Sequence, residues 1–289
     1  MLRPTLIFAA ACHLAVLASP VLGQSLQLPF TLSRPAGEGP FPAVVILHDC
    51  SGLGPKSSGA PWRWSSELTS RGYVTLWPDS FSQRGHPGGV CTDASPPRVT
   101  YEQRARDAYA ALTYLQSLPF VDARRIGVMG GSNGGTATLA AIVDTAENMA
   151  RSGPGFAAAI ALYPSCGFSF GGWSVERAQQ QRGPVTRYSG AFKPLAPLLI
   201  LIGELDDWTP AEHCRKLAKA AQSAGYPVEI KVYPDAHHSF DSIAPVRYIA
   251  RRINRNSPTG RGATTGGNAQ AWADAIEQVD RFLAAHVGK

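Results

Sequence analysis

The chain has 289 residues, of which 44% are hydrophobic and 17% are charged. This apolar content is enough for one sizeable core, and the low charge excludes an intrinsically disordered protein. The 27 basic and 21 acidic residues give a formal net charge of +6. The basic excess is spread along the chain and is densest between Arg247 and Arg261, which argues against a dedicated nucleic-acid binder.

Residues 1–23 have the layout of a secretory signal peptide. Arg3 precedes an apolar run over residues 6–18, and small or aliphatic side chains follow. The run is too short to span a bilayer, so we predict cleavage before Gln24. The mature protein, residues 24–289, is expected to be secreted or periplasmic, to form a single domain and to have no membrane span. A buried N-terminal helix is the alternative.

Six short apolar runs predict strands that are buried on both faces. Each run ends at a turn signal, as the first does at Asp49-Cys-Ser-Gly52. The runs cover residues 43–47, 73–77, 126–129, 157–163, 198–202 and 228–233.

Helical patterns separate the strands. Apolar residues at spacings of three and four predict a helix over 101–115, and helix-favouring segments follow over 136–149, 211–224 and 271–285. Strands that alternate with helices predict an α/β fold, with a mostly parallel central sheet and helices on both faces. In such sheets the chemistry collects at the carboxyl ends of the strands.

Two stretches do not fit this alternation. Residues 167–197 are rich in Gly, Gln and Arg and are interpreted as a lid or a substrate-binding insertion. Residues 257–268 are rich in Gly and Thr and are predicted to form a flexible loop.

The predicted mature chain keeps four cysteines, Cys50, Cys91, Cys166 and Cys214, an even number that suits an oxidising compartment. Three pairings are possible. We favour Cys50–Cys91 and Cys166–Cys214, because each pair then lies on neighbouring loops at one end of the sheet. Buried free thiols are the alternative, and a zinc site is disfavoured because no two cysteines have the close spacing usual for metal ligands.

The pattern Gly-x-Ser-x-Gly occurs twice, around Ser132 and around Ser169. A nucleophile elbow needs a strand that leads directly into a sharp turn and then a helix. Residues 125–129 and 136–142 supply that strand and that helix on either side of Ser132. At Ser169 the strand has already been broken by Pro164. Ser132 is therefore the predicted nucleophile, and an ordinary Gly-rich turn between strand and helix is the alternative.

An oxyanion needs backbone N–H donors beside the nucleophile. The amide of Asn133 lies at a predicted helix N-terminus, where free N–H groups stabilise negative charge. The second donor is expected in the loop after the first apolar run, where Cys50 is preferred and Ser51 is the alternative.

A serine hydroxyl becomes a good nucleophile when an imidazole accepts its proton and a carboxylate orients that imidazole. In this fold the chain order is serine, acid, histidine. The loop after the fifth predicted strand offers Asp206 as the acid, with Asp207 as the alternative. The loop after the sixth offers His238 as the base, with His237 as the alternative.

Five segments, spread over most of the predicted mature chain, carry a resemblance to a known family. They are Val45-Ile-Leu-His-Asp49, Trp77-Pro-Asp79, Gly127-Val-Met-Gly-Gly-Ser-Asn-Gly-Gly135, Gly203-Glu-Leu-Asp206 and Ala236-His-His-Ser-Phe240. This ordered set resembles the dienelactone hydrolase family of the α/β-hydrolase fold. The resemblance implies a triad of Ser132, Asp206 and His238 and a carboxylate close to the nucleophile at Asp49. The best-known members carry Cys where this chain has Ser132.

The predicted function is an exported serine carboxylic ester hydrolase that acts on a small-molecule ester through an acyl-enzyme, with no metal or organic cofactor. A peptidase or amidase on the same triad is one alternative, and a non-catalytic binding protein that kept the scaffold is another. A nucleic-acid or polyanion binder would use the arginines of the basic segment, which we expect instead to solvate a helix face: Arg247, Arg251, Arg252 and Arg255. The sequence does not indicate an oligomeric state.

Overall fold

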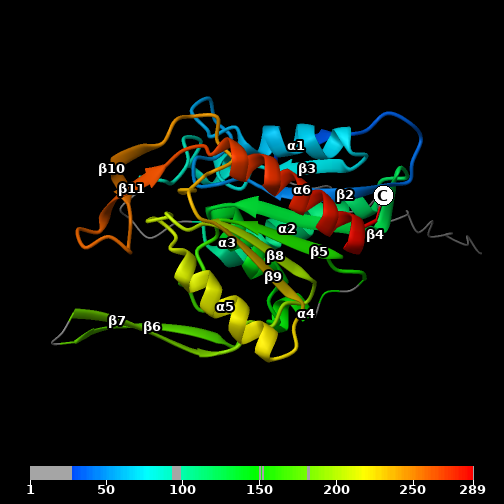
Figure 1. Cartoon of the computed structure of the whole chain (residues 1–289). Coiled ribbons are helices and arrows are strands. Elements are labelled where there is room, and N and C mark those ends of the chain that lie inside the picture. Colours follow the sequence, from blue (N-terminus) through cyan, green and yellow to red (C-terminus); the bar gives the residue numbers. More distant parts are fainter. Residues whose placement is uncertain (1–27, 93–98, 150, 152, 181–182, 289) are drawn as a thin grey trace, which may run out of the picture.

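A computed structural model describes residues 28–92, 99–149, 151, 153–180 and 183–288. Its main element is a seven-stranded sheet in the order β1-β3-β2-β4-β5-β8-β9 (Figure 1). Strand β1 is antiparallel to β3, and every other neighbouring pair is parallel. The predicted α/β fold with a mostly parallel sheet is confirmed. The predicted signal peptide, residues 1–23, lies outside the described residues.

Six strands of the sheet coincide with the six predicted apolar runs, and the first strand was not predicted. That strand, β1, is a short edge strand whose first two residues are exposed, so it has no continuous apolar run. The strands are β1 (Phe30–Ser33), β2 (Phe41–Leu47), β3 (Val74–Pro78), β4 (Val121–Gly131), β5 (Ala158–Leu162), β8 (Leu198–Gly203) and β9 (Val228–Tyr233).

The helices are α1 (Ala60–Ser70), α2 (Tyr101–Gln116), α3 (Asn133–Ile142), α4 (Ala146–Met149), α5 (Ala211–Ser223) and α6 (Ala269–His286), and a short 3-10 turn, η1, covers Ser82–Arg84. Helix α1 was missed because its buried face includes Pro61 and Ser65 instead of a regular row of aliphatic side chains. The single helix predicted over 136–149 is wrong. It divides because Val143 is extended and pairs with Pro194.

Helices cover both faces of the sheet, as predicted (Figure 1). Helices α1 and α6 lie on one face, where the rings of Trp64 and Trp272 meet edge to face with centroids 4.6 Å apart. Helices α2 and α3 pack together on the other face. A capping box on Thr100 and Gln103 begins α2.

The strand order reverses around β2, which lies between β3 and β4. Leu47 at the end of β2 pairs with Gly130 near the end of β4, so the loops that follow these two strands start side by side. The connections then depart to opposite faces of the sheet. Such a switch point leaves a crevice at the carboxyl ends of the strands, where ligands of α/β proteins bind.

Two hairpins outside the main sheet project from the same end of the molecule (Figure 1). The segment 167–197 contains β6 (Trp173–Gln180) paired with β7 (Gly183–Gly190). Strand β10 (Arg247–Ile253) pairs with β11 (Arg261–Thr265), so the prediction of a flexible loop over 257–268 is wrong in this part. The expected helix face for the basic segment is also wrong, because its arginines lie on or just after β10.

Both favoured disulfides are present, Cys50–Cys91 and Cys166–Cys214. The first joins the loop after β2 to a segment beyond η1, and the second joins the loop after β5 to helix α5. The alternative of buried free thiols is therefore wrong. Among the described residues, no helix combines the length and the apolar character that crossing a membrane requires.

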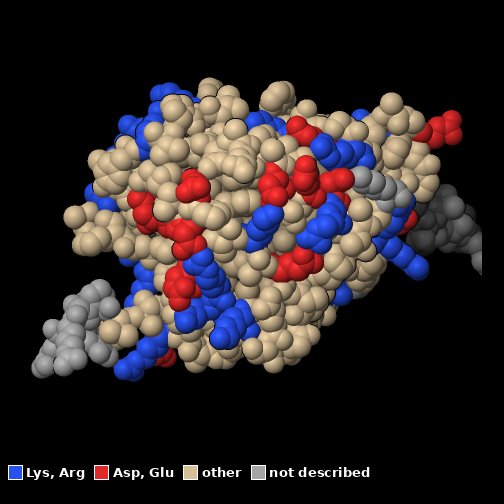
Figure 2. All heavy atoms as spheres, viewed as in Figure 1, with Lys and Arg blue, Asp and Glu red and all other residues tan. Residues whose placement is uncertain are grey.

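Charges of both signs are mixed on the face covered by α5 and α6 (Figure 2). Arg215 on α5 pairs with Glu204, and Arg281 on α6 pairs with Glu229. Because acidic and basic side chains alternate here, this face does not present the continuous basic surface that a polyanion binder uses.

Candidate active site

Ser132 lies at a sharp bend between β4 and α3. Its φ of 55° is in a region that L-residues rarely adopt. Glycines on both sides make the bend possible: a Cβ on Gly134 would lie 2.0 Å from the carbonyl oxygen of Leu47, and one on Gly130 would lie 2.5 Å from the carbonyl of Gly134. The strand, the turn and the helix can therefore pack this closely only with glycine at these positions.

Three predicted side chains meet at this bend. The Oγ of Ser132 lies 2.9 Å from Nε2 of His238, and Nδ1 of His238 lies 2.8 Å from Oδ2 of Asp206. All three are buried, with 7%, 1% and 3% of their surface exposed, respectively. In this geometry the carboxylate accepts from Nδ1–H, which leaves Nε2 free to accept the serine proton.

The loop after β8 fixes the carboxylate of Asp206. Its Oδ1 accepts hydrogen bonds from the amides of Trp208, at 3.0 Å, and Thr209, at 2.8 Å. Its Oδ2 accepts from the hydroxyl of Thr209 at 2.8 Å. These donors hold the oxygen that faces His238 in one position.

His238 is held by packing and by the second hairpin. Its ring contacts those of Tyr163 and Trp208, with centroids 4.9 Å and 4.8 Å away. Its carbonyl accepts from the amide of Gly266 at 3.0 Å, directly after β11. The hairpin that the sequence did not predict therefore positions the histidine loop.

The structure places the alternative residues elsewhere. Asp207 accepts from the amide and hydroxyl of Thr264, both at 2.8 Å, and is exposed. Nδ1 of His237 lies 3.0 Å from the carbonyl of Leu205. Ser169 is exposed, and its hydroxyl accepts from a backbone amide of the β6 strand. None of these three has a hydrogen bond to Ser132, His238 or Asp206 within the described residues.

The two residues whose amides are expected to face an oxyanion, Cys50 and Asn133, line the larger cavity together with Ser132. Asn133 is the first residue of α3, so its amide has no carbonyl one helical turn earlier to donate to. Cys50 follows β2, and its amide donates to no backbone carbonyl in the described part of the chain. The amide of Ser51, the alternative donor, already donates to Oδ1 of Asp49 at 2.6 Å.

The carboxylate of Asp49 is occupied by the loop that contains it. Oδ1 accepts from the amide and hydroxyl of Ser51, and Oδ2 accepts from the hydroxyl of Ser58. Its described hydrogen bonds include none to Ser132 or His238. Asp49 thus shapes the loop that carries Cys50, and it lines the smaller cavity at Ser132.

Sequence reasoning missed a buried pair, His48 and Arg104, that ties this loop to the bend. Arg104 is fully buried and donates to the carbonyl of His48 at 2.7 Å and to Oδ1 of Asn133. Nε2 of His48 accepts from the amide of Ser80 at 3.1 Å, so Nδ1 is the nitrogen that donates to the carbonyl of Asp49, at 2.8 Å. That carbonyl belongs to the same peptide unit as the Cys50 amide.

The charges of this pair follow from their burial. Burial lowers the pKa of Arg104 to about 10, so the guanidinium stays charged at neutral pH. Burial, followed by the charge of Arg104, lowers the pKa of His48 to about 3. His48 is therefore neutral at physiological pH, which its role as both donor and acceptor requires.

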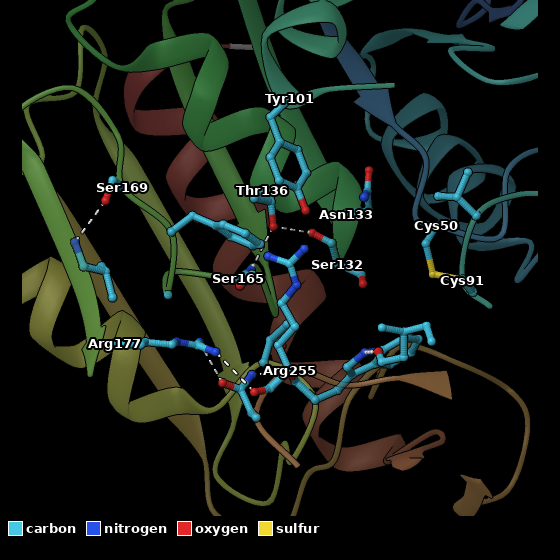
Figure 3. A pocket seen from close by; sticks show the side chains of 18 residues that line it. Cys50, Cys91, Tyr101, Ser132, Asn133, Thr136, Ser165, Ser169, Arg177 and Arg255 are labelled. Carbon is cyan, nitrogen blue, oxygen red and sulfur yellow. Dashed lines mark hydrogen bonds between the residues drawn. A yellow bond between two sulfur atoms is a disulfide. The ribbon is translucent and has the colours of Figure 1, made fainter. Parts of the chain in front are cut away.

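Two cavities open onto Ser132. The larger, of about 570 Å³, is lined by Asn133 and by Val175 and Arg177 of β6, and Figure 3 shows Arg255 and Arg177 among its lining side chains. The smaller, of about 230 Å³, is lined by His238. Four residues line both cavities: Cys50, Cys91, Ser132 and Trp208.

Comparisons with known proteins agree with this fold. A model of the dienelactone hydrolase family matches residues 29–287. A candidate 2-oxo-3-(5-oxofuran-2-ylidene)propanoate lactonase of Bradyrhizobium sp is 24% identical over 214 residues, which are 72% of this chain and 77% of that protein. A candidate carboxymethylenebutenolidase of Methylorubrum extorquens is 26% identical over 221 residues, which are 74% and 68% of the two chains.

A solved structure extends the comparison. Esterase 2 of Thermogutta terrifontis, phosphonylated by cyclosarin, aligns with a TM-score of 0.61 at 19% identity over 89% of this chain and 88% of that one. The architecture is thus that of an α/β hydrolase. The chain belongs to the dienelactone hydrolase family, and it is a hydrolase that acts on ester bonds.

Proposed function

We propose that the protein is an exported serine carboxylesterase in which Ser132 is the nucleophile, His238 the general base and acid, and Asp206 the residue that orients it. The observation that carries the proposal is the continuous hydrogen-bonded series from the Ser132 hydroxyl through His238 to Asp206, at 2.9 Å and 2.8 Å. This arrangement activates a hydroxyl that is otherwise a weak nucleophile.

The acylation half of the proposed reaction proceeds from this geometry. As the Oγ of Ser132 bonds to the ester carbonyl carbon, its proton passes to Nε2 of His238, and the carbonyl oxygen becomes an oxyanion. The amides of Cys50 and Asn133 donate to that oxyanion. The bond to the alcohol then breaks, and His238 returns its proton to the leaving oxygen.

Deacylation repeats these steps with water. His238 takes a proton from a water molecule whose oxygen attacks the acyl-enzyme carbonyl. Collapse of the second tetrahedral intermediate releases the carboxylic acid and returns the proton to Ser132. Asp206 stabilises the imidazolium in both halves and stays ionised.

The two disulfides support the proposal of export, because such bonds persist in oxidising compartments. The proposed cleavage before Gln24 is tested by N-terminal sequencing of protein recovered from the periplasm or the medium. Recovery of uncleaved protein in the cytoplasm alone would contradict it.

The proposed activity is tested with p-nitrophenyl acetate and the matching anilide. We expect hydrolysis of the ester by the wild type and by Ser169→Ala, and a loss of at least about a thousandfold in kcat for Ser132→Ala. Equal activity of folded Ser132→Ala would contradict the assigned nucleophile. Comparable kcat/KM values for the anilide and the ester would favour an amidase on the same residues.

A further inference from the structure

The direction in which an ester sits in the site follows from the position of His238. In the proposed reaction His238 protonates the leaving oxygen, so the alcohol must lie on its side of Ser132. His238 lines the smaller cavity, whereas Asn133 is among the residues that line the larger one and His238 is not. The acyl group therefore extends into the larger cavity.

The lining of this larger cavity is aromatic near Ser132. The rings of Tyr101 and Phe168 meet edge to face, with centroids 5.4 Å apart, and Trp208 lies on the side shared with the smaller cavity. Val90 and Ile253 add aliphatic surface. Aromatic rings arranged in this way favour a further ring from the substrate, which can meet them by stacking or by an edge contact.

A planar cation, the guanidinium of Arg255, also lines the cavity. The guanidinium of Arg255 lies 5.9 Å from the ring centroid of Phe168, and the Arg255 side chain extends among the lining residues in Figure 3. Within the described residues it has no ion pair, unlike Arg215 and Arg281 on the outer face. A free guanidinium in a cavity can lie over the face of a bound ring.

The volume of the cavity also favours an acyl group larger than acetyl. Its volume of about 570 Å³ lies within the range of pockets that hold whole small molecules, roughly 300–1,000 Å³. An acetyl group would leave most of this space unfilled and is too small to contact all three aromatic side chains at once. A ring attached to the ester carbonyl would fill more of the cavity and matches its aromatic lining.

We propose that the larger cavity is an aryl-binding acyl site, formed by Tyr101, Phe168, Trp208 and Arg255, and that the protein prefers esters of arylcarboxylic acids. This inference rests on the proposed esterase function. It assigns to the segment 167–197 the role of supplying one wall of the acyl site, because Phe168 and Arg177 both line the cavity.

The test compares p-nitrophenyl benzoate with p-nitrophenyl cyclohexanecarboxylate, which has a saturated ring of similar size. Each kcat/KM is divided by the rate constant for hydroxide hydrolysis of the same ester. We expect the wild type to prefer the benzoate about three- to tenfold, the size of one or two aromatic contacts. Phe168→Leu should reduce this ratio toward one.

A matched substitution serves as the control. Phe30→Leu removes a ring from strand β1, where Phe30 packs on Tyr114, outside both cavities at Ser132. It should leave the benzoate preference unchanged. Equal normalised rates for the two esters in the wild type, or a preference that survives in folded Phe168→Leu, would overturn the aryl site.

Binding measurements distinguish a failure of this inference from a failure of the esterase proposal. Calorimetry with Ser132→Ala should show tighter binding of the benzoate ester than of the cyclohexanecarboxylate ester. If folded wild-type protein hydrolyses neither ester but Ser132→Ala still shows this difference, the proposed function is wrong and the aryl site stands. Hydrolysis of both esters without any difference in binding or rate contradicts the aryl site alone.

Discussion

The Oγ of Ser132 and the Nε2 of His238 lie 2.9 Å apart, although 106 positions separate the two residues in the chain. Ser132 directly follows β4 and His238 follows β9, and strands β5 and β8 lie between β4 and β9 in the sheet. The loop after β9 therefore has to reach back across two strands. The contacts of His238 with Trp208, Tyr163 and Gly266 hold it in that position.

The carboxylate that orients His238 is predicted to be Asp206 alone. Asp206→Asn should lower kcat by about a hundred- to ten-thousandfold, because an amide no longer fixes the productive tautomer of the imidazole. Asp207→Asn should change kcat less than about twofold, since Asp207 binds Thr264 instead. Steady-state kinetics on p-nitrophenyl acetate measure both, and a larger loss in Asp207→Asn would reverse the assignment.

The Cys50–Cys91 disulfide should matter more for activity than Cys166–Cys214. The two bonds span 41 and 48 residues, so the loss of either should lower the free energy of unfolding by a similar amount, about 2–5 kcal/mol. Only the first anchors the proposed oxyanion donor. The double variant Cys50→Ala/Cys91→Ala should therefore show the larger fall in kcat, measured where both variants are folded by circular dichroism. Equal falls in kcat would argue against this role for Cys50.

Arg104 is predicted to position the loop after β2, which carries the proposed oxyanion donor Cys50. Arg104→Met removes the hydrogen bonds to the carbonyl of His48 and to Asn133, so kcat should fall about tenfold or more with a smaller change in KM. Arg104→Lys should not restore kcat, because one ammonium group cannot donate hydrogen bonds in both directions, to His48 and to Asn133, as the guanidinium does. Arg106→Met on the exposed face of the same helix is the control. An unchanged kcat in folded Arg104→Met would refute this role.

His48 should make stability depend on pH in the acid range. Its pKa is about 3 in the folded protein and about 6.5 in the unfolded chain, so the unfolded state binds more protons between these values. Stability from this residue is fully present above about pH 6.5 and is lost as the pH falls toward 3, by an amount on the order of a few kcal/mol.

Denaturant unfolding between pH 7 and pH 4 measures this dependence. The free energy of unfolding of His48→Gln should fall less steeply with acid than that of the wild type. His286→Gln, on the exposed end of α6, should keep the wild-type slope. The same slope in all three proteins would show that His48 titrates normally in the folded state.

The sequence was sufficient for six of the seven strands of the main sheet. Buried parallel strands have continuous apolar runs, as in β4 before Ser132 and β8 before Asp206, whereas β9 before His238 alternates apolar and charged residues. Arg104 could not be found, because a charged residue in a helix usually faces solvent and nothing local indicates that it is fully buried. Strand β10 was missed because its exposed, arginine-rich sequence has no apolar alternation and is stabilised by pairing with β11.

The most direct test of the proposed mechanism is labelling of the folded protein with a fluorophosphonate, followed by trypsin digestion and mass spectrometry. The tryptic peptide of residues 126–151 contains Ser132 as its single serine. We predict one label per chain, on this peptide, and none after substitution of Ser132 by Ala. A label on the peptide that contains Ser169, or no label on active, folded protein, would contradict the proposed nucleophile.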